Sequence, residues 1–299
     1  MAKGYDENEI KTKLIDLLNK SKGGLSGIEI SEKLGINRIT MTKYLNVFAA
    51  EGIIQQRDIG NTHLWLIQEG TEKLQFPDDY SKAQEEYANF LNNASGDAAI
   101  SFIRNCVNSG ANPLTLTTEV ILPAIKSVRE LFDEGKIGTS EQNLIFESIS
   151  DSIKIIRLQN TLSDPEKNIV VFSTDVNSAL VSDATSAVFH SRNWKVSSLG
   201  NMSSAMDVLF DLDLKKLLTK IWKGKEGVMI IVVCASSEEG LKFFSEAFQS
   251  VKGKTEKNLN LVFNAKVGKK TNVDADLITE NLDEIIQWSE TAYENATGK

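Results

Sequence analysis

The stretch "NIVVFSTDVNSALVSDATSAVFHSRNWKVSSLG", residues 168–200, combines an apolar run, a polar turn, a run with helical spacing and a second strand-like run. The first run, 168–173, is almost continuously apolar, which is typical of a strand covered on both faces. A helix over 177–191 is expected to lead to a second strand over 195–200. The stretch therefore predicts a strand–helix–strand unit of a parallel sheet.

The same alternation continues toward the end of the chain. Apolar runs predict three more strands, at 227–234, 258–263 and near 276–278. Helices are expected between and after them, over 204–222, 237–251 and 280–293. Because alternating strands and helices form a parallel sheet with helices on both faces, we expect a flavodoxin-like strand order. In such a sheet a crevice opens at the carboxyl ends of the strands.

Upstream of this region, apolar residues recur at helical spacing. They predict four helices, at 80–93, 96–108, 113–134 and 139–161. The short loops "NSGANP" and "GKIG" make neighbouring helices antiparallel, so a four-helix bundle is expected. The segment "GTEKLQFPDDY" (70–80) contains Pro77, which interrupts a helix, and is interpreted as a connector.

The N-terminal part predicts three helices and a hairpin. The run "ENEIKTKLIDLLNK" (7–20) forms the first helix, Ser26 is expected to cap a second that ends at Gly35, and Asn37 caps a third. The run "IIQQRDIGNTHLWLI" (53–67) predicts two strands joined at Asp58–Asn61. Together these elements resemble the winged helix-turn-helix of transcription regulators over about residues 5–68.

The third helix of this motif turns Met41, Leu45 and Phe48 inward and leaves its polar side chains outside. In winged helices the N-terminal part of that helix enters the major groove of DNA. We expect contacts to bases, phosphates or the minor groove from Arg38, Thr40, Thr42, Lys43 and Asn46 on the helix and from Arg57, Asn61 and His63 on the wing. Winged helices also serve as dimer or protein-interaction modules, which stays an alternative.

Charge is distributed unevenly along the chain. The net charge is −8, but residues 1–68 hold nine Lys/Arg and eight Asp/Glu (+1), so the remainder holds 24 and 33 (−9). A near-neutral module on an acidic body suits a protein that contacts DNA through one small surface. No apolar run is long enough for a membrane span, and the start "MAKGYDENEI" has no apolar signal core, so a cytoplasmic protein is expected.

These patterns predict a multidomain protein. We expect a winged helix at 1–68 with an α+β fold, a connector at 69–79, an all-α four-helix-bundle cap at 80–162, and an α/β flavodoxin-like domain at 163–299. The two cysteines, Cys106 and Cys234, lie far apart in apolar surroundings and are interpreted as buried structural thiols.

The segment "VILPAIKSVRELFDEGKIGTSEQNLIFESIS" (120–150), followed by the alternating region, resembles the helical cap and Rossmann-like domain of cobalamin-binding proteins. That family includes methionine synthase, corrinoid proteins and the light-sensing MerR-type regulators, and the resemblance covers about residues 80–293. In its photoreceptor branch a tryptophan lies over the cobalamin, followed by a glutamate–histidine pair. The corresponding positions here are Phe132, Gln142 and Asn143.

The resemblance also implies a ligand set that this sequence lacks. The family's first loop reads acidic residue, x, histidine, x, x, glycine, and the histidine binds cobalt while the acid fixes its tautomer. The matching positions are Val176, Ser178 and Val181. A glycine pair of the family is replaced by Asn264 and Ala265. We therefore expect no histidine-ligated cobalamin, no metal and no resident cofactor.

Two interpretations of the crevice remain open. It binds a different small effector through a polar lining, or it is filled, and Asp175 or Asn177 merely caps the following helix. The candidate residues for the lining are Phe132, Gln142, Asn143, Thr174, Asp175, Asn177, Ser178, Ser236, Ser237 and Asn264.

The sequence thus predicts a non-enzymatic transcription regulator that binds double-stranded DNA. We expect a homo-oligomer, a dimer or tetramer, whose paired DNA-reading modules are controlled by a small-molecule effector or a protein partner. One alternative is a corrinoid or methyl-carrier protein associated with an enzyme. The other is an adaptor that uses both modules for protein contacts.

Overall fold

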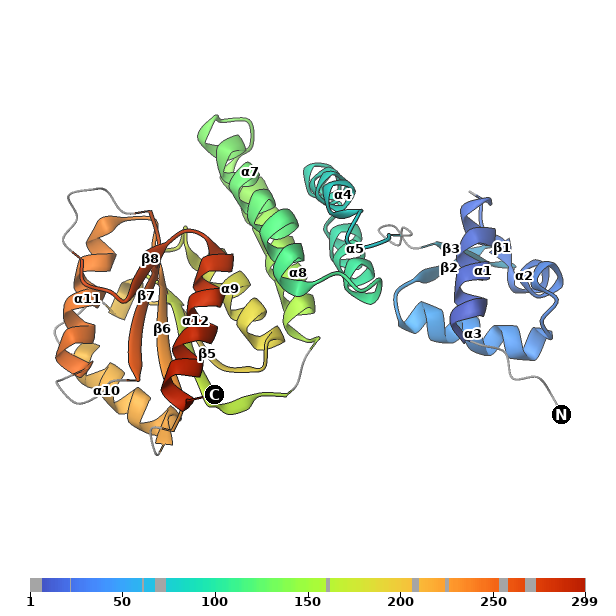
Figure 1. Cartoon of the computed structure of the whole chain (residues 1–299). Helices are drawn as coiled ribbons and strands as arrows, with labels where there is room; N and C mark the ends of the chain where they lie inside the picture. The colour runs from blue at the N-terminus through green and yellow to red at the C-terminus, as the bar shows by residue number, and fades with distance from the viewer. Residues whose placement is uncertain are drawn as a thin grey trace.

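The computed structural model describes residues 7–21, 23–60, 62–67, 74–159, 162–205, 210–223, 226–252, 258–266 and 273–298. Along the chain it forms an N-terminal helical part with a small antiparallel sheet, a run of helices, and a five-stranded parallel sheet flanked by helices (Figure 1). We call these parts the head (7–67), the helical segment (74–159) and the sheet unit (162–298).

The head packs three helices against a three-stranded antiparallel sheet. Its elements are α1 (Glu7–Asn19), β1 (Leu25–Ser26), α2 (Gly27–Leu34), α3 (Arg38–Ala50), β2 (Ile54–Ile59) and β3 (Thr62–Ile67), with the strand order β1-β3-β2. The predicted helices and hairpin are confirmed. The two-residue strand β1 was not predicted, because it exists only through its pairing with Leu64 and Trp65 of β3.

The predicted caps of the head are also confirmed. Ser26 and Glu29 form a capping box, in which the Ser26 hydroxyl accepts from the Glu29 N–H at 3.3 Å and the Glu29 carboxylate accepts from the Ser26 N–H at 2.8 Å. Gly35 ends α2 in the left-handed conformation with φ 66°. Asn37 accepts from the Ile39 N–H at 2.9 Å and starts α3. The start of α3 is thus fixed by local sequence.

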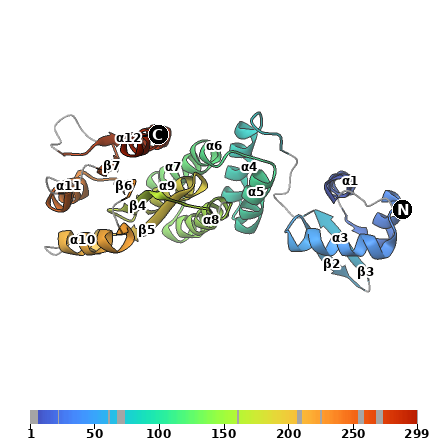
Figure 2. The ribbon, with the colours of Figure 1, turned by 60° about the horizontal axis from the view of Figure 1, so that its bottom comes forward.

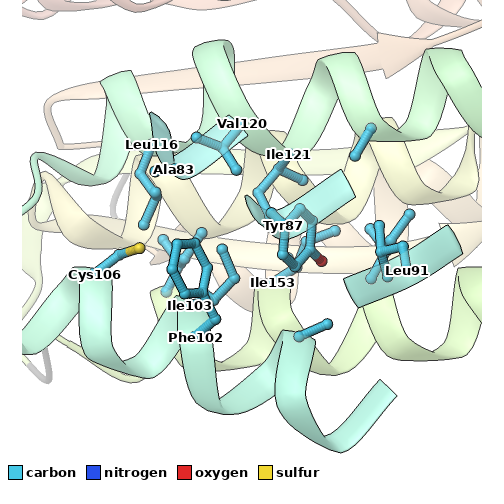
Figure 3. Close-up of a cluster of buried hydrophobic side chains, with 14 of the residues drawn as sticks. Ala83, Tyr87, Leu91, Phe102, Ile103, Cys106, Leu116, Val120, Ile121 and Ile153 are labelled. Atoms are coloured by element: carbon cyan, nitrogen blue, oxygen red, sulfur yellow. The ribbon is translucent and has the colours of Figure 1, made fainter. Parts of the chain in front are cut away.

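The helical segment encloses one apolar core. Its helices are α4 (Tyr80–Asn92), α5 (Gly96–Asn108), α6 (Pro113–Leu116), α7 (Leu122–Asp133) and α8 (Thr139–Arg157). Figure 3 shows Tyr87, Phe102, Ile121 and Ile153 meeting in this core from four elements.

Two of the predicted helices differ from the structure. The expected helix 113–134 contains a π-helical turn, η1 (Thr117–Ile121), because Pro123 has no N–H to donate and its ring crowds the carbonyl four residues back. The expected helix 139–161 ends at Arg157, where the Gln159 N–H donates to the Ile156 carbonyl and tightens the last turn.

The sheet unit has the predicted flavodoxin-like order. Its strands are β4 (Asp164–Ser173), β5 (Trp194–Asn201), β6 (Val228–Cys234), β7 (Leu259–Asn264) and β8 (Leu277–Thr279), all parallel in the order β5-β4-β6-β7-β8. Its helices are α9 (Ala179–Ser191), α10 (Phe210–Ile221), α11 (Glu238–Lys252) and α12 (Leu282–Thr297). Strand β4 starts four residues earlier than expected, since Asp164 pairs with Trp194 before a register shift.

Alternate residues of β4 face opposite layers of helices. Val170 and Phe172 pack with residues of α10 and α11, whereas Ile169 and Val171 pack with residues of α9 and α12. The period of two in these contacts is that of a strand buried on both faces, as the apolar run predicts.

Helix α9 joins the sheet unit to the helical segment. Ala184 and Ala187 belong to the core of the helical segment, while Val188 and Phe189 belong to the core between the sheet and its helices. Both views show α8 beside α9, between α5 and the strands (Figures 1 and 2). One helix is therefore buried on two sides, and it positions the helical segment against the sheet.

Both cysteines lie in cores and are unpaired. Burial raises the pKa of Cys106 and of Cys234 to about 12, so neither is a thiolate at neutral pH. The prediction of buried structural thiols is confirmed.

No helix in the described ranges is long and apolar enough to span a membrane.

Ala187→Leu tests the contact between α8 and α9. Position 187 is fully buried, so the larger side chain should overpack the contact and lower the free energy of unfolding by about 1–3 kcal/mol. Urea unfolding followed by tryptophan fluorescence measures the change. The control Ala50→Leu adds the same volume at an exposed position and should change it by less than about 0.5 kcal/mol. Equal stability of wild type and Ala187→Leu would contradict the described packing.

Candidate functional site

The exposed face of α3 carries most of the residues predicted to contact DNA. Arg38, Thr42, Lys43 and Asn46 are exposed, and Thr40 is half-buried. The opposite face is buried in the core of the head through Met41, Leu45 and Phe48. The Thr42 hydroxyl donates to the Arg38 carbonyl at 2.9 Å, so its hydrogen is already used within the helix.

The cations on this surface are unpaired. Within the described part of the chain, the side chains of Arg38, Lys43 and Arg57 form no ion pair or hydrogen bond, whereas on α1 Lys13 lies 2.6 Å from Glu9. Helix α3 itself contains no Asp or Glu. Helix α3 and strand β2 therefore carry cations without a partner among the described residues, whereas both lysines of α1 are paired, Lys13 with Glu9 and Lys11 with Glu51.

The hairpin of β2 and β3 exposes Arg57 and His63, which lie on opposite faces of the strand pair because His63 pairs with Asp58 and Arg57 with Leu64. The His63 Nδ1 lies 2.5 Å from the Asp58 carboxylate and 3.0 Å from the Gln56 amide, so only its Nε2 is left for an external group. The hydrogen bond from His63, and a second from Gln56, hold the pKa of Asp58 below its usual value. Asn61, predicted at the turn, lies outside the described residues.

The second candidate site, at the carboxyl edge of the sheet, is organised by the Asp175 carboxylate. It accepts from the Thr174 hydroxyl at 3.0 Å, from the Ser178 N–H at 2.8 Å and hydroxyl at 3.0 Å, and from the Ser236 N–H at 2.9 Å. Asp175 thus caps the start of α9 and also ties the loop after β4 to the loop after β6. Thr174 and Ser178 are buried, and their hydroxyls point at Asp175 rather than into an open crevice.

Asp175 is ionised at neutral pH despite its partial burial. Burial by itself would raise the pKa of this carboxyl, but the hydrogen bonds from Ser236, Ser178 and Thr174 outweigh it, so the pKa lies below its usual value.

A contact that the sequence did not reveal comes from α7. An Nη of Arg129 donates to the Asn177 carbonyl, and the guanidinium also feels the charge of Asp175. Arg129 and Asn177 lie 48 positions apart in the sequence. Nothing in the residues around Arg129 distinguishes it from other cations on the polar face of an amphipathic helix, so the sequence carried no signal for this contact. The structure thus joins the helical segment to the loop after β4.

The other predicted lining residues are dispersed. Ser237 is exposed, and Asn264 is buried with its amide 3.5 Å from the Thr185 hydroxyl. Phe132, Gln142 and Asn143 flank the turn between α7 and α8, which lies at the outer tip of that helix pair (Figure 1). The structure groups Thr174, Asp175, Asn177, Ser178 and Ser236, and the residue of α7 that contacts this group is Arg129.

Two hollows in the described part of the structure lie away from this edge. One of about 240 Å³ lies between the head and α5, with Lys11, Ile15, Ile53 and Arg104 in its wall. Another of about 250 Å³ lies between α12 and the start of β7, with Asn260, Trp288 and Asn295 in its wall. Neither is lined by the predicted crevice residues.

No protein-family model and no curated protein matches the sequence. The helical segment followed by a parallel five-stranded sheet is, however, an architecture shared with corrinoid proteins. The monomethylamine corrinoid protein of Methanosarcina barkeri superposes with a TM-score of 0.54, over 72% of this chain and 99% of that chain, at 14% identity. The methanol:cobalamin methyltransferase complex MtaBC of the same organism aligns with a TM-score of 0.34, over 74% and 86%, also at 14% identity. The first match shows a common fold.

Asp175→Ala tests the role of this carboxylate. The change removes a helix cap and the tie between two loops, so we expect a loss of about 1–2 kcal/mol at pH 7. Because the folded-state pKa is lowered, the contribution is complete above about pH 4 and decreases as the pH falls toward the folded-state pKa. Urea unfolding at pH 7, 4 and 3 measures it, with the exposed Glu280→Ala as control. A difference independent of pH would argue against the carboxylate's role.

Proposed function

We propose that the protein is a DNA-binding transcription regulator and that its head is a winged helix-turn-helix. The observation that carries the proposal is that three exposed cations of the head, Arg38 and Lys43 on α3 and Arg57 on β2, form no ion pair or hydrogen bond within the described residues. Binding to DNA depends on cations that are free to neutralise phosphates. A cation already paired with a carboxylate contributes less, as with Lys13 and Glu9.

The dimensions of the head agree with this role. Helix α3 has 13 residues and is about 20 Å long, and an α-helix fits the major groove of B-DNA. In this arrangement Arg38, Thr42 and Asn46 face the bases and Lys43 a phosphate, while Arg57 reaches the backbone from the hairpin. The free Nε2 of His63 is the group that this residue offers to DNA.

The helical segment and the sheet unit then serve assembly and control and carry no catalysis. A homodimer or tetramer would present paired heads to two half-sites on double-stranded DNA. The polar groups at the carboxyl edge of the sheet already form hydrogen bonds with one another through Asp175. Control by a protein partner, or by an effector bound elsewhere, is therefore favoured over an effector bound in the crevice.

Arg38→Ala and Lys43→Ala test DNA binding. In gel shifts on genomic fragments at matched salt, Arg38→Ala should weaken binding at least about fivefold, and Lys43→Ala should also reduce the slope of log affinity against log salt by about one. Lys13→Ala removes a cation that is already paired and is the matched control, with affinity unchanged. The absence of any gel shift at low salt would contradict the DNA-binding proposal and favour the alternative that the protein is an adaptor for protein contacts. Unchanged binding by Arg38→Ala would remove that residue from the reading surface.

A second candidate function, a corrinoid or methyl-carrier protein, is supported by the shared fold. The residues at the corresponding edge do not fit a histidine-ligated cobalamin. The chain has two histidines: His63 lies in the head, and His190 lies at the far end of α9, about 18 Å along the helix from Ser178. Ser178 itself is buried and bonded to Asp175. No described group of three or more His, Cys, Asp and Glu side chains could hold a metal ion.

Incubation with hydroxocobalamin and with methylcobalamin separates the two functions. After gel filtration, we expect the protein fraction to carry no corrinoid absorbance, because no axial imidazole is near the edge of the sheet. A coloured complex with one cobalamin per chain would favour the carrier.

A further inference from the structure

The exposed face of α3 carries a large aliphatic side chain in its first turn. Ile39 is 72% exposed, although it lies in the first turn of a helix that buries Met41, Leu45 and Phe48. At 100° per residue, Ile39 lies about 180° around the helix from Phe48, the side chain that anchors α3 in the core. A partner that binds the exposed face of α3 would therefore contact Ile39.

The surroundings of Ile39 indicate a polyanionic partner. Arg38 precedes it and Lys43 lies one turn further, and neither cation is paired within the described residues. With no Asp or Glu on α3, a second copy of this face would bring like charges together. DNA offers the opposite charge together with an apolar group at the right depth, because thymine carries a C5-methyl on the floor of the major groove.

We propose that Ile39 reads thymine through its C5-methyl group, so that the site this protein selects contains a thymine beside the base contacted by Arg38. This inference rests on the proposed DNA-binding function. The Arg38 guanidinium matches the two acceptors of guanine. The Thr42 hydroxyl donates to the Arg38 carbonyl, so Thr42 adds its methyl group to the apolar surface of Ile39. Arg38 and Ile39 then specify adjacent bases by different chemistry.

The test uses one set of DNA sequences with and without the methyl group. Random-sequence duplexes are enriched on the full-length protein, and the enriched pool is amplified with either dTTP or dUTP, which differ only in the C5-methyl. We expect wild-type protein to bind the uracil pool about three- to fivefold more weakly for each contacted methyl. Ile39→Ala should lose a similar factor on the thymine pool and should no longer distinguish the two pools.

Two further measurements assign the effect to Ile39. Leu158→Ala removes a side chain that is 73% exposed outside the head, and it should keep the full preference for thymine. Ile39→Ala should keep the wild-type salt dependence, because it leaves Arg38 and Lys43 in place. Circular dichroism establishes that the variant is folded.

Three results would overturn the inference while leaving DNA binding intact. They are equal affinity of wild type for both pools, a thymine preference that persists in Ile39→Ala, or a change in oligomeric state in Ile39→Ala, which would assign the side chain to a contact between chains. No enrichment of any duplex at low salt would instead contradict the proposed function.

Discussion

Helix α9 has two sets of neighbours, and the arrangement of residues 74–298 depends on how its side chains meet both. Toward α8 it presents Ala184 and Ala187, and toward the sheet it presents the larger Val188 and Phe189. Small side chains let two helices approach to the short end of the usual 8–10 Å range, while large ones fill the space above a pleated sheet. The helical segment and the sheet unit therefore meet through the apolar faces of a shared helix, and the hydrogen bond from Arg129 to Asn177 adds a polar contact beside it.

The distribution of charge gives the two ends of the chain different properties. Residues 69–299 carry a net charge of −9, which repels a nucleic acid, and residues 1–68 carry +1. Within the head Lys13 pairs with Glu9 and Lys11 with Glu51, whereas Arg38, Lys43 and Arg57 form no ion pair within the described residues. In the proposed regulator, repulsion from the body and attraction to α3 would orient the protein before any base is contacted.

Local patterns were enough to predict most of the fold, and long-range contacts limited the rest. Capping residues such as Ser26 and Asn37, and the apolar run of β4, act over a few positions, so the sequence identified α2, α3 and the parallel sheet. The contact between Arg129 and Asn177, and that between Asp175 and Ser236, join elements 48 and 61 residues apart. The sequence identified Asp175 as a possible cap but could not show that it also accepts from the Ser236 N–H of another loop, and the exposure of Ile39 required the packing of α3.

The Asp175 network restricts how this loop can change. Replacing Ser178 alone with histidine would place an imidazole where a side chain is 5% exposed and remove a hydroxyl bonded to the carboxylate. Replacing Asp175 alone would leave the N–H groups of Ser178 and Ser236 without their acceptor. Each of these two single replacements is therefore expected to lower the stability of the loop. Selection for stable folding alone would therefore preserve the present pair, Asp175 and Ser178, even if the loop bound no ligand.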